Sequence, residues 1–458
     1  MQVTESKTGT GLLARLKHWS GIDRAIGFTI LGRGWSSMAG VVNVFLIARF
    51  LSPFEQGYYY TFGSLVAIQI VFELGFSFVI QQMASHECAH LAITAGGQIC
   101  GEARYRQRLA SVLQTTVRWY SCAAALFLLG LLPSGLVFFG MHSHSGPAAG
   151  WQIPWICVAI AATLTFQIDP LFAFLEGCGF VPLVARSRMQ QAIAGSLLAW
   201  TGLLLHHGLY APALMIFGQA LVGTATLWQQ RDLLGLLLRT QVGEHKIVWM
   251  REVWPFQWRI AVSWTCGYFI FQLFNPILFA FHGAQAAGQM GMSLSIGTAV
   301  ANVGISWIST KSAPFGAMIA KRDFVQLDRV FFRALKQSWT VCLVGCVALF
   351  IGALWCKHMN FSIAQRLLDP VAFAFLLGTI VVNHVVFAEA IYLRAHKQEK
   401  FLFNSITVAL LMAPSTYYFG RYYGATGMMA GYFVINALVG LCAGTYIFIH
   451  CRRSWHGA

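Results

Sequence analysis

The chain is 458 residues long, 57% of its residues are hydrophobic and only 10% are charged, and its formal net charge is +15. An ordinary globular domain has about 25% charged residues, and a soluble fold could not bury this much apolar surface, so a soluble protein is excluded. In a membrane protein, the excess of basic residues reflects cytoplasmic loops rather than nucleic-acid binding. We therefore expect an all-α polytopic membrane protein with no nucleic-acid partner.

Apolar runs long enough to cross a membrane recur along the chain and predict about twelve transmembrane helices. A bilayer core about 30 Å thick needs about 20 apolar residues per helix. Residues 1–24 are polar and basic, and we expect no cleavable signal there. The predicted spans lie near 25–48, 57–80, 118–140, 153–175, 189–207, 210–228, 254–281, 286–310, 337–356, 370–393, 401–420 and 425–449.

The basic residues are distributed unevenly between the predicted loops. If the N-terminus is cytoplasmic, most of the 31 lysines and arginines fall in cytoplasmic segments, including the stretches 104–108 and 321–336. Lysine and arginine are enriched in the cytoplasmic loops of membrane proteins. The sequence therefore predicts that both termini are cytoplasmic.

A weak internal repeat divides the chain into two halves. The stretch ARFLSPFEQGYYYTFGSL (Ala48–Leu65) ends one predicted helix and begins the next, and LFAFHGAQAAGQMGMSLS (Leu278–Ser295) does the same in the second half. Gly57 of the first copy matches Gly288 of the second, which predicts parallel repeats related by an axis along the membrane normal. The expected organisation is a cytoplasmic amphipathic N-terminus (1–24), a six-helix bundle (25–228), a cytoplasmic linker (229–253), a second six-helix bundle (254–450) and a cytoplasmic tail (451–458).

The stretch ASHECAHLA (Ala84–Ala92) contains the pattern H-E-x-x-H between His86 and His90, which on a helix can bind zinc. It lies just past the second predicted span, on the cytoplasmic side, and a catalytic zinc site needs a third protein ligand. The only candidate from a comparable motif, Asp369, falls on the opposite side of the membrane. We therefore expect no metal site, and instead an interfacial amphipathic helix over Met83–Ala92.

Ionisable residues inside the predicted spans are candidate functional groups, because a charge in the hydrocarbon costs several kcal/mol unless it is paired or hydrated. There are five of them: Arg33, Glu73, Asp169, Arg259 and Glu389. One interpretation is that they form ion pairs that fasten helices within each bundle. The other is that the arginines face a water-filled cleft and bind phosphate oxygens, while the carboxylates bind a proton or Na⁺ or act in gating.

Prolines and uncharged polar residues also interrupt the spans. Asp169-Pro170 and Asn275-Pro276 fall within long apolar helices, where proline removes a backbone hydrogen bond and is expected to kink the helix. Uncharged polar side chains at similar depths either line a cavity or hydrogen-bond between helices. The predicted cavity residues of this kind are Gln69, Gln167, Gln272, Asn275 and Asn383.

A Leu-Ser-Pro-x-Glu-x-Gly turn between two helices (Leu51–Gly57), its weak second copy and the basic N-terminus together carry a family resemblance. The chain resembles the multidrug/oligosaccharidyl-lipid/polysaccharide (MOP) flippase superfamily, and within it the polysaccharide-biosynthesis, O-antigen-flippase-like branch. The resemblance covers the whole chain in helix count and in the six-plus-six arrangement. It is sharpest over Arg49–Leu65.

The resemblance implies two six-helix bundles around a central V-shaped cavity that opens alternately to either side of the membrane. The implied activity is to flip an undecaprenyl-diphosphate-linked glycan across the bacterial inner membrane in polysaccharide or lipopolysaccharide biosynthesis. The implied partners are membrane lipid, the lipid-linked glycan and H⁺ or Na⁺, with the protein acting as a monomer without a cofactor. By the same resemblance, Arg33 and Arg259 would hold the diphosphate, and Glu73, Asp169 and Glu389 would serve coupling or gating.

The chain departs from this pattern in having few deep arginines and several deep acids. That leaves a second hypothesis, a cation-coupled exporter of drugs or other small molecules from the same superfamily. A membrane-embedded glycan polymerase or ligase is a third hypothesis. It is disfavoured, because the longest outer connections, near 141–152 and 357–369, are too short to form a catalytic domain.

Overall fold

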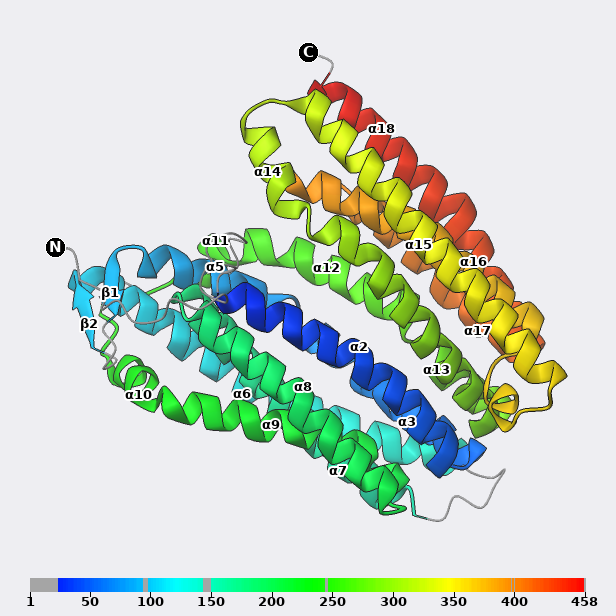
Figure 1. Ribbon diagram of the computed structural model, residues 1–458. Helices are drawn as coiled ribbons and strands as arrows, with labels where there is room; N and C mark the ends of the chain where they lie inside the picture. Colours follow the sequence, from blue (N-terminus) through cyan, green and yellow to red (C-terminus); the bar gives the residue numbers. More distant parts are fainter. Residues whose placement is uncertain are drawn as a thin grey trace, which may run out of the picture.

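The computed structural model describes residues 24–93, 98–142, 150–243, 246–396, 398 and 400–456. The predicted amphipathic N-terminus lies outside these residues, except for Arg24, which begins the first helix. The described chain is almost entirely helical and forms an N-terminal and a C-terminal lobe that lie against each other (Figure 1). The predicted all-helical fold with two bundles is confirmed.

The N-terminal lobe, blue to green in Figure 1, holds the first half of the helices and one short hairpin. Its β1 and β2 pair antiparallel, with Ala92 opposite Cys100. Its elements are α2 (Arg24–Phe50), α3 (Pro53–Val66), α4 (Gln69–Glu73), α5 (Phe76–Cys88), β1 (Leu91–Ile93), β2 (Ile99–Gly101), α6 (Ala103–His142), α7 (Gln152–Gly177), α8 (Val181–Leu204), η1 (Gly208–Tyr210) and α9 (Ala211–Gln229).

The predicted linker contains two short helices, α10 (Arg231–Arg239) and α11 (Trp249–Glu252), and leads into the C-terminal lobe. The last helix runs to His456, beyond the predicted end of the bundle at residue 450. The elements of this lobe are α12 (Trp254–Phe271), α13 (Phe274–Ser309), α14 (Ser312–Ala320), α15 (Phe324–His358), η2 (Ser362–Arg366), α16 (Pro370–Ala395), α17 (Leu402–Ile435), the π-helix η3 (Asn436–Leu441) and α18 (Cys442–His456).

Within the described residues, eight helical stretches are long and apolar enough to cross a membrane, or nine if the bent pair α3–α4 and α5 counts as one span. Two stretches, Gln257–Ala320 and Leu402–Trp455, have 64 and 54 residues, far more than the roughly 20 that one crossing needs. Each is divided by a glycine with positive φ, Gly283 at 82° and Gly424 at 62°, a conformation that glycine adopts without steric cost. Each therefore supplies two crossings, and α8 supplies the remaining predicted span.

Two of the predicted spans are broken within the membrane. The second bends by 45° between α4 and α5, where Leu74 and Gly75 both have positive φ, and the sequence did not predict this bend. The seventh is interrupted between Phe271 and Phe274, directly before Asn275-Pro276, as predicted. By contrast, Pro170 lies within α7, which stays one continuous helix.

The two lobes meet most closely where the two copies of the repeat, on α3 and α13, pack against each other. A Cβ atom on Gly57 would overlap the Ala284 carbonyl, and one on Gly288 would lie 2.9 Å from the Gly57 nitrogen. Glycine at both positions thus allows the backbones to touch. We call this region, formed by Leu51–Gly57, Gly283–Gly291 and η2, the sealed end. Contact between equivalent residues is what a two-fold axis along the membrane normal produces.

Hydrogen bonds also link the lobes at the sealed end. Ser52 and Glu55 form a capping box that starts α3, with Pro53 in the first turn, which explains the Ser-Pro-x-Glu part of the motif. The buried Gln56 side chain donates to the Gly288 carbonyl at 2.8 Å and accepts from Arg366 of η2 at 3.1 Å. The Arg366 guanidinium also donates to the carbonyl of Leu51. The motif therefore builds both the helix start and the contact between the lobes.

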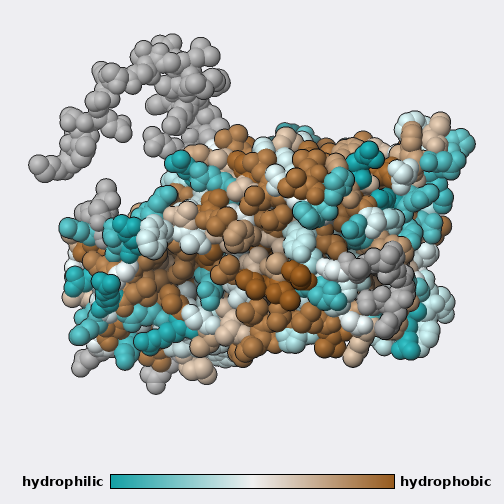
Figure 2. Space-filling view, turned by 90° about the horizontal axis from the view of Figure 1, so that it is seen from below, coloured by the Kyte–Doolittle hydropathy of each residue, from teal (hydrophilic) through white to brown (hydrophobic). Residues whose placement is uncertain are grey.

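Away from the sealed end, the lobes diverge toward the region that carries the hairpin, α10 and α14, which we call the basic end because the basic stretches 104–108 and 321–336 lie there (Figure 1). Figure 2 shows apolar side chains spread over the middle of one face and polar side chains gathered toward both ends. Large apolar side chains such as Leu129 and Leu410 are about 70% exposed. This apolar middle is the surface expected to face lipid.

Gly57→Ala should destabilise the protein, because the added Cβ would overlap the Ala284 carbonyl and push α3 and α13 apart. Overpacking of this kind costs about 1–3 kcal/mol, so the melting temperature in detergent should fall. Gly130→Ala is the matched control, since a Cβ there meets no described atom within 4 Å. An unchanged melting temperature for Gly57→Ala would contradict the close packing of the two helices.

Candidate functional site

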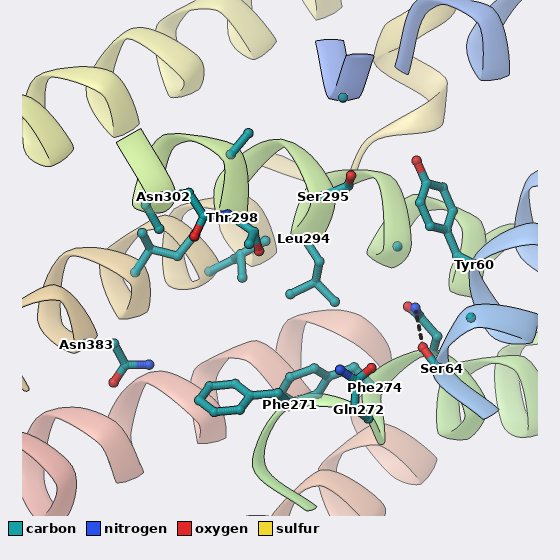
Figure 3. A pocket seen from close by; sticks show the side chains of 18 of the residues that line it. Tyr60, Ser64, Phe271, Gln272, Phe274, Leu294, Ser295, Thr298, Asn302 and Asn383 are labelled. Atoms are coloured by element: carbon teal, nitrogen blue, oxygen red, sulfur yellow. Dashed lines mark hydrogen bonds between the residues drawn. The ribbon is translucent and has the colours of Figure 1, made fainter. Parts of the chain in front are cut away.

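A cavity of about 790 Å³ lies between the lobes, next to the sealed end. The N-terminal lobe contributes residues of α2 and α3 to its wall, and the C-terminal lobe contributes residues of α12, α13, α16 and α17. In Figure 3, side chains of α13 and side chains from the break between α12 and α13 point toward each other across the space. Its volume is within the range of small-molecule binding sites, about 300–1,000 Å³.

The polar side chains in the cavity wall recur at helical spacing. On α13, Ser295, Thr298 and Asn302 lie three and four residues apart, so they share one face of the helix. This stripe was not among the predicted cavity residues, although its three- and four-residue spacing is visible in the sequence. The polar lining residues are Ser36, Ser37, Tyr60, Ser64, Gln272, Asn275, Ser295, Thr298, Asn302, Asn383, His384 and Tyr432.

Hydrogen bonds hold several of these side chains in place. Asn275 donates through Nδ2 to Ser64 Oγ at 3.0 Å, a bond between the two lobes that Figure 3 draws as a dashed line. Its Oδ1 is buried and has no hydrogen-bond partner within the described part of the chain. Asn383 donates to the Tyr432 hydroxyl at 3.3 Å. Buried polar atoms are usually hydrogen-bonded, so the unpaired Asn275 oxygen leaves this contact between the lobes incompletely satisfied.

The apolar part of the wall combines aromatic rings with leucine, isoleucine and alanine side chains. Phe274 packs edge-on against Tyr432 with ring centroids 4.9 Å apart, and Phe271 lies 6.3 Å from Phe387. All four rings line the cavity. Ligand sites commonly combine such apolar surfaces with a few fixed polar groups.

Three of the five predicted cavity residues, Gln272, Asn275 and Asn383, lie in the wall of this cavity. The other two do not line it. Gln69 begins α4 in the N-terminal lobe, and Gln167 is exposed on α7. All five residues were predicted to lie at similar depths in the membrane. The predicted depth of a residue does not fix which face of its helix it occupies.

The two predicted phosphate-binding arginines are both exposed and lie outside the cavity wall as described. Arg33 precedes the lining residues Ser36, Ser37 and Gly40 by three, four and seven positions on α2, so it lies on the same helix face. It is therefore about one turn from the cavity, toward the basic end. Arg259 lies on α12, with its guanidinium carbon 5.5 Å from the centre of the Trp258 ring.

None of the three predicted carboxylates is among the described residues that line the cavity. Asp169 is 3.7 Å from Arg188, which also lies 3.6 Å from Glu176, and the side chains of Asp169 and Arg188 are both about half exposed. Glu73 ends α4, at the bend. Arg188 was not among the predicted charged residues of the spans, because the fifth span was predicted to begin at 189, whereas α8 begins at Val181.

Glu389 on α16 is only 3% exposed. Thr445 donates a hydrogen bond of 3.0 Å to its Oε1, while its Oε2 lacks a partner among the described residues. Among the described residues, no ion pair joins Glu389 to Arg259, so the two do not form the predicted basic–acidic set of the second half. A buried carboxylate with one free oxygen is a candidate to bind a proton or a cation.

The H-E-x-x-H stretch adopts a different structure from the predicted interfacial helix. The predicted helix over Met83–Ala92 is confirmed only as far as Cys88, where α5 ends, because Leu91–Ile93 pairs with β2 in the hairpin. His90 falls beyond the helix and stacks on Tyr105. Within the described residues, no group of three or more potential ligands could hold a metal ion.

Glu87, the acid of this stretch, is buried and pairs with Arg108 at 2.8 Å. Arg108 also binds Glu252 of α11 at 2.6 Å. Burial raises the pKa of Glu252, but hydrogen bonds from the Val248 N–H and from Arg108 lower it more, so the net shift is downward. Arg108 of α6 thus joins Glu87 of α5 to Glu252 of the linker. These two ion pairs anchor the linker to α5 and α6, which is a structural role.

No family model matches the chain, and no curated protein matches it. Its fold is similar to those of solved transporters. A multidrug resistance MATE family transporter of the MOP superfamily, inward-facing, aligns with a TM-score of 0.54 at 14% identity, over 91% of this chain and 99% of that one. The lipid II flippase MurJ, inward closed, aligns with a TM-score of 0.58 at 13% identity, over 94% and 90%.

A MOP superfamily transporter from Pyrococcus furiosus, described as having a binding pocket of reverse polarity, aligns with a TM-score of 0.52 at 13% identity, over 94% of both chains. At these identities the likeness establishes the fold. The predicted resemblance to the MOP superfamily is confirmed at that level, and the polysaccharide branch remains a prediction.

Proposed function

We propose that this protein is an alternating-access transporter that flips an undecaprenyl-diphosphate-linked glycan across the bacterial inner membrane. The observation that carries the proposal is the cavity between the lobes, bounded by contacts between the repeats at one end. A transporter of this type needs such a site, and it needs two halves that can tilt about it. The similarity in fold to a lipid II flippase supports the same class of substrate.

In this proposal the glycan occupies the cavity and the diphosphate binds Arg33 at its mouth. A guanidinium presents paired donors that match phosphate oxygens. Arg259, at the start of the corresponding helix of the other lobe, is the second phosphate ligand. The lipid chain stays in the bilayer beside α2, whose exposed residues include Ile30, Leu31 and Phe45.

The distribution of basic residues sets the proposed orientation. The basic end faces the cytoplasm together with both termini, and the sealed end faces outward. The conformation described here is then open toward the inside and closed outside. The protein works as a monomer with membrane lipid around it, since a single chain contains both lobes and the cavity between them.

The carboxylates inside the lobes are the proposed coupling and gating groups. Asp169 shares Arg188 with Glu176, so a proton or Na⁺ bound there would release the arginine to its other partner. Glu73 lies at the α4–α5 bend and can transmit that change to the helix that faces the other lobe. Glu389 is the matching group of the C-terminal lobe.

The alternative, a cation-coupled multidrug exporter, is favoured by the similarity in fold to MATE transporters. An organic cation needs a nearby negative charge to offset its loss of hydration. Among the described lining residues of the cavity there is no carboxylate. The cavity therefore fits a glycan better than a cationic drug.

Arg33→Ala should slow flipping at least about tenfold, because a lost charged hydrogen bond costs about 1.5–3 kcal/mol. Flipping is measured in proteoliposomes that contain an undecaprenyl-diphosphate-linked oligosaccharide, as the fraction of glycan that a membrane-impermeant glycosidase can reach. Arg33→Lys should be intermediate. The control is Arg49→Ala, which removes an exposed arginine at the other end of the same helix. Flipping by Arg33→Ala at the wild-type rate would refute the assignment.

Glu389→Gln and Asp169→Asn should each reduce the dependence of flipping on an imposed pH or Na⁺ gradient, since neither variant can bind the coupling ion at that position. Flipping without a gradient should persist. The measurement compares rates with and without the gradient in the same proteoliposomes, with the exposed Glu102→Gln as control. If both variants keep the full gradient dependence, these carboxylates are structural.

A further inference from the structure

We infer that the cavity selects uncharged glycans, made of sugars that offer hydroxyl and amide groups and carry no carboxylate or phosphate in the part held between the lobes. The inference rests on the proposed flippase function and narrows its substrate class. It comes from the chemistry of the cavity wall, which combines many neutral hydrogen-bonding groups with aromatic rings.

The wall is polar without being charged. Among the described residues that line it, none is Asp, Glu, Lys or Arg, and the one imidazole, that of His384, is hydrogen-bonded to Ser338 Oγ at 2.8 Å. Hydroxyl and amide side chains both donate and accept hydrogen bonds. Sugar hydroxyls and N-acetyl groups have the same property, so they can be matched group by group.

The two lobes each provide part of this neutral surface. Ser36 and Ser37 come from α2, while Thr298 and Asn302 come from α13. A glycan between them would therefore contact both lobes by neutral hydrogen bonds. Such bonds can be exchanged for water when the lobes part, because their net free energy is small.

Asn275 contributes to this neutral wall at the break between α12 and α13, where its bond to Ser64 joins the two lobes. Its amide carries no charge, so it offers no counter-charge to an anion beside it. A sugar carboxylate or phosphate at this point would lose hydration without forming an ion pair.

The charged residues at the depth of the membrane do not line the cavity as described. Arg188 is shared by Asp169 and Glu176 within the N-terminal lobe, where Arg188 and Asp169 are about half exposed. Glu389 is buried against Thr445 inside the C-terminal lobe. Arg33 lies about one turn outside the lining residues of α2, where it meets the diphosphate. An acidic sugar that passed Arg33 would find no counter-charge among the described lining residues.

The test compares two undecaprenyl-diphosphate-linked oligosaccharides that differ only in one sugar, a hexose in the first and the corresponding hexuronic acid in the second. Wild-type protein in proteoliposomes should flip the neutral compound at least about tenfold faster. Equal rates, or faster flipping of the acid, would overturn the inference and leave the proposed function intact. If neither compound is flipped, the proposed function itself fails.

A charge introduced into the wall should change this preference. Thr298→Lys places an ammonium at an exposed position of the cavity and should reduce the neutral-to-acidic rate ratio at least about tenfold. Ser37→Lys tests the same point from the other lobe, should the first variant fold poorly. Thr298→Val, of similar size and without charge, should keep the wild-type ratio. An unchanged ratio in both lysine variants overturns the inference.

Discussion

The close approach of α3 and α13 at Gly57 and Gly288 is the constraint on which the rest of the structure depends. A side chain at either position would meet the opposing backbone, so the lobes touch here only because both residues are glycine. The contact sets the distance between the lobes at one end of the molecule. It also places Ser64 of α3 within hydrogen-bonding distance of Asn275 in the neighbouring segment, so the cavity wall is assembled from both lobes.

The remaining contacts at the sealed end combine hydrogen bonds with buried aromatic packing. Gln56 bridges to Gly288 and Arg366 by hydrogen bonds, which water can replace at little net free-energy cost. The rings of Tyr58 on α3 and Phe139 on α6 pack against Phe279 on α13, with centroids 4.9 and 5.2 Å apart. The apolar cluster holds the gate closed in the conformation described, and alternating access requires these rings to separate. The repeat motif is informative about function because it forms this gate.

Much of the fold follows from the sequence because a bilayer imposes simple rules. Apolar length predicts the spans, and the repeat predicts two lobes in contact through equivalent glycines. Proline at Asn275-Pro276 correctly marked a break. The bend at Leu74 and Gly75 was not predicted. A leucine rarely adopts positive φ, and a single glycine in an apolar run does not by itself indicate a left-handed conformation. The hairpin after α5 was missed because its short strands lack a clear pattern of alternation.

The site was harder to predict than the fold. Hydropathy locates a residue by depth but does not say whether its helix face meets lipid, a neighbouring helix or a cavity. Gln272 and Gln167 therefore looked equivalent, although only the first lines the cavity. Charged residues within apolar spans can be identified as functional candidates from the sequence, because burying a charge is costly. Neutral polar residues such as Thr298 and Asn302 cannot be identified in this way. In the structure, Arg33 lies at the mouth of the cavity, and uncharged residues form the surface of its wall.

The central claim is that the sealed end opens during transport. Spin labels at His207 of the N-terminal lobe and Gln365 of η2, both exposed and close to the sealed end, report this directly in lipid nanodiscs, in a background whose exposed native cysteines are replaced by serine. Electron–electron distance measurements should show one distance at rest. Addition of a neutral lipid-linked oligosaccharide should create a second, longer population. A single, unchanged distance with and without that substrate would contradict the account.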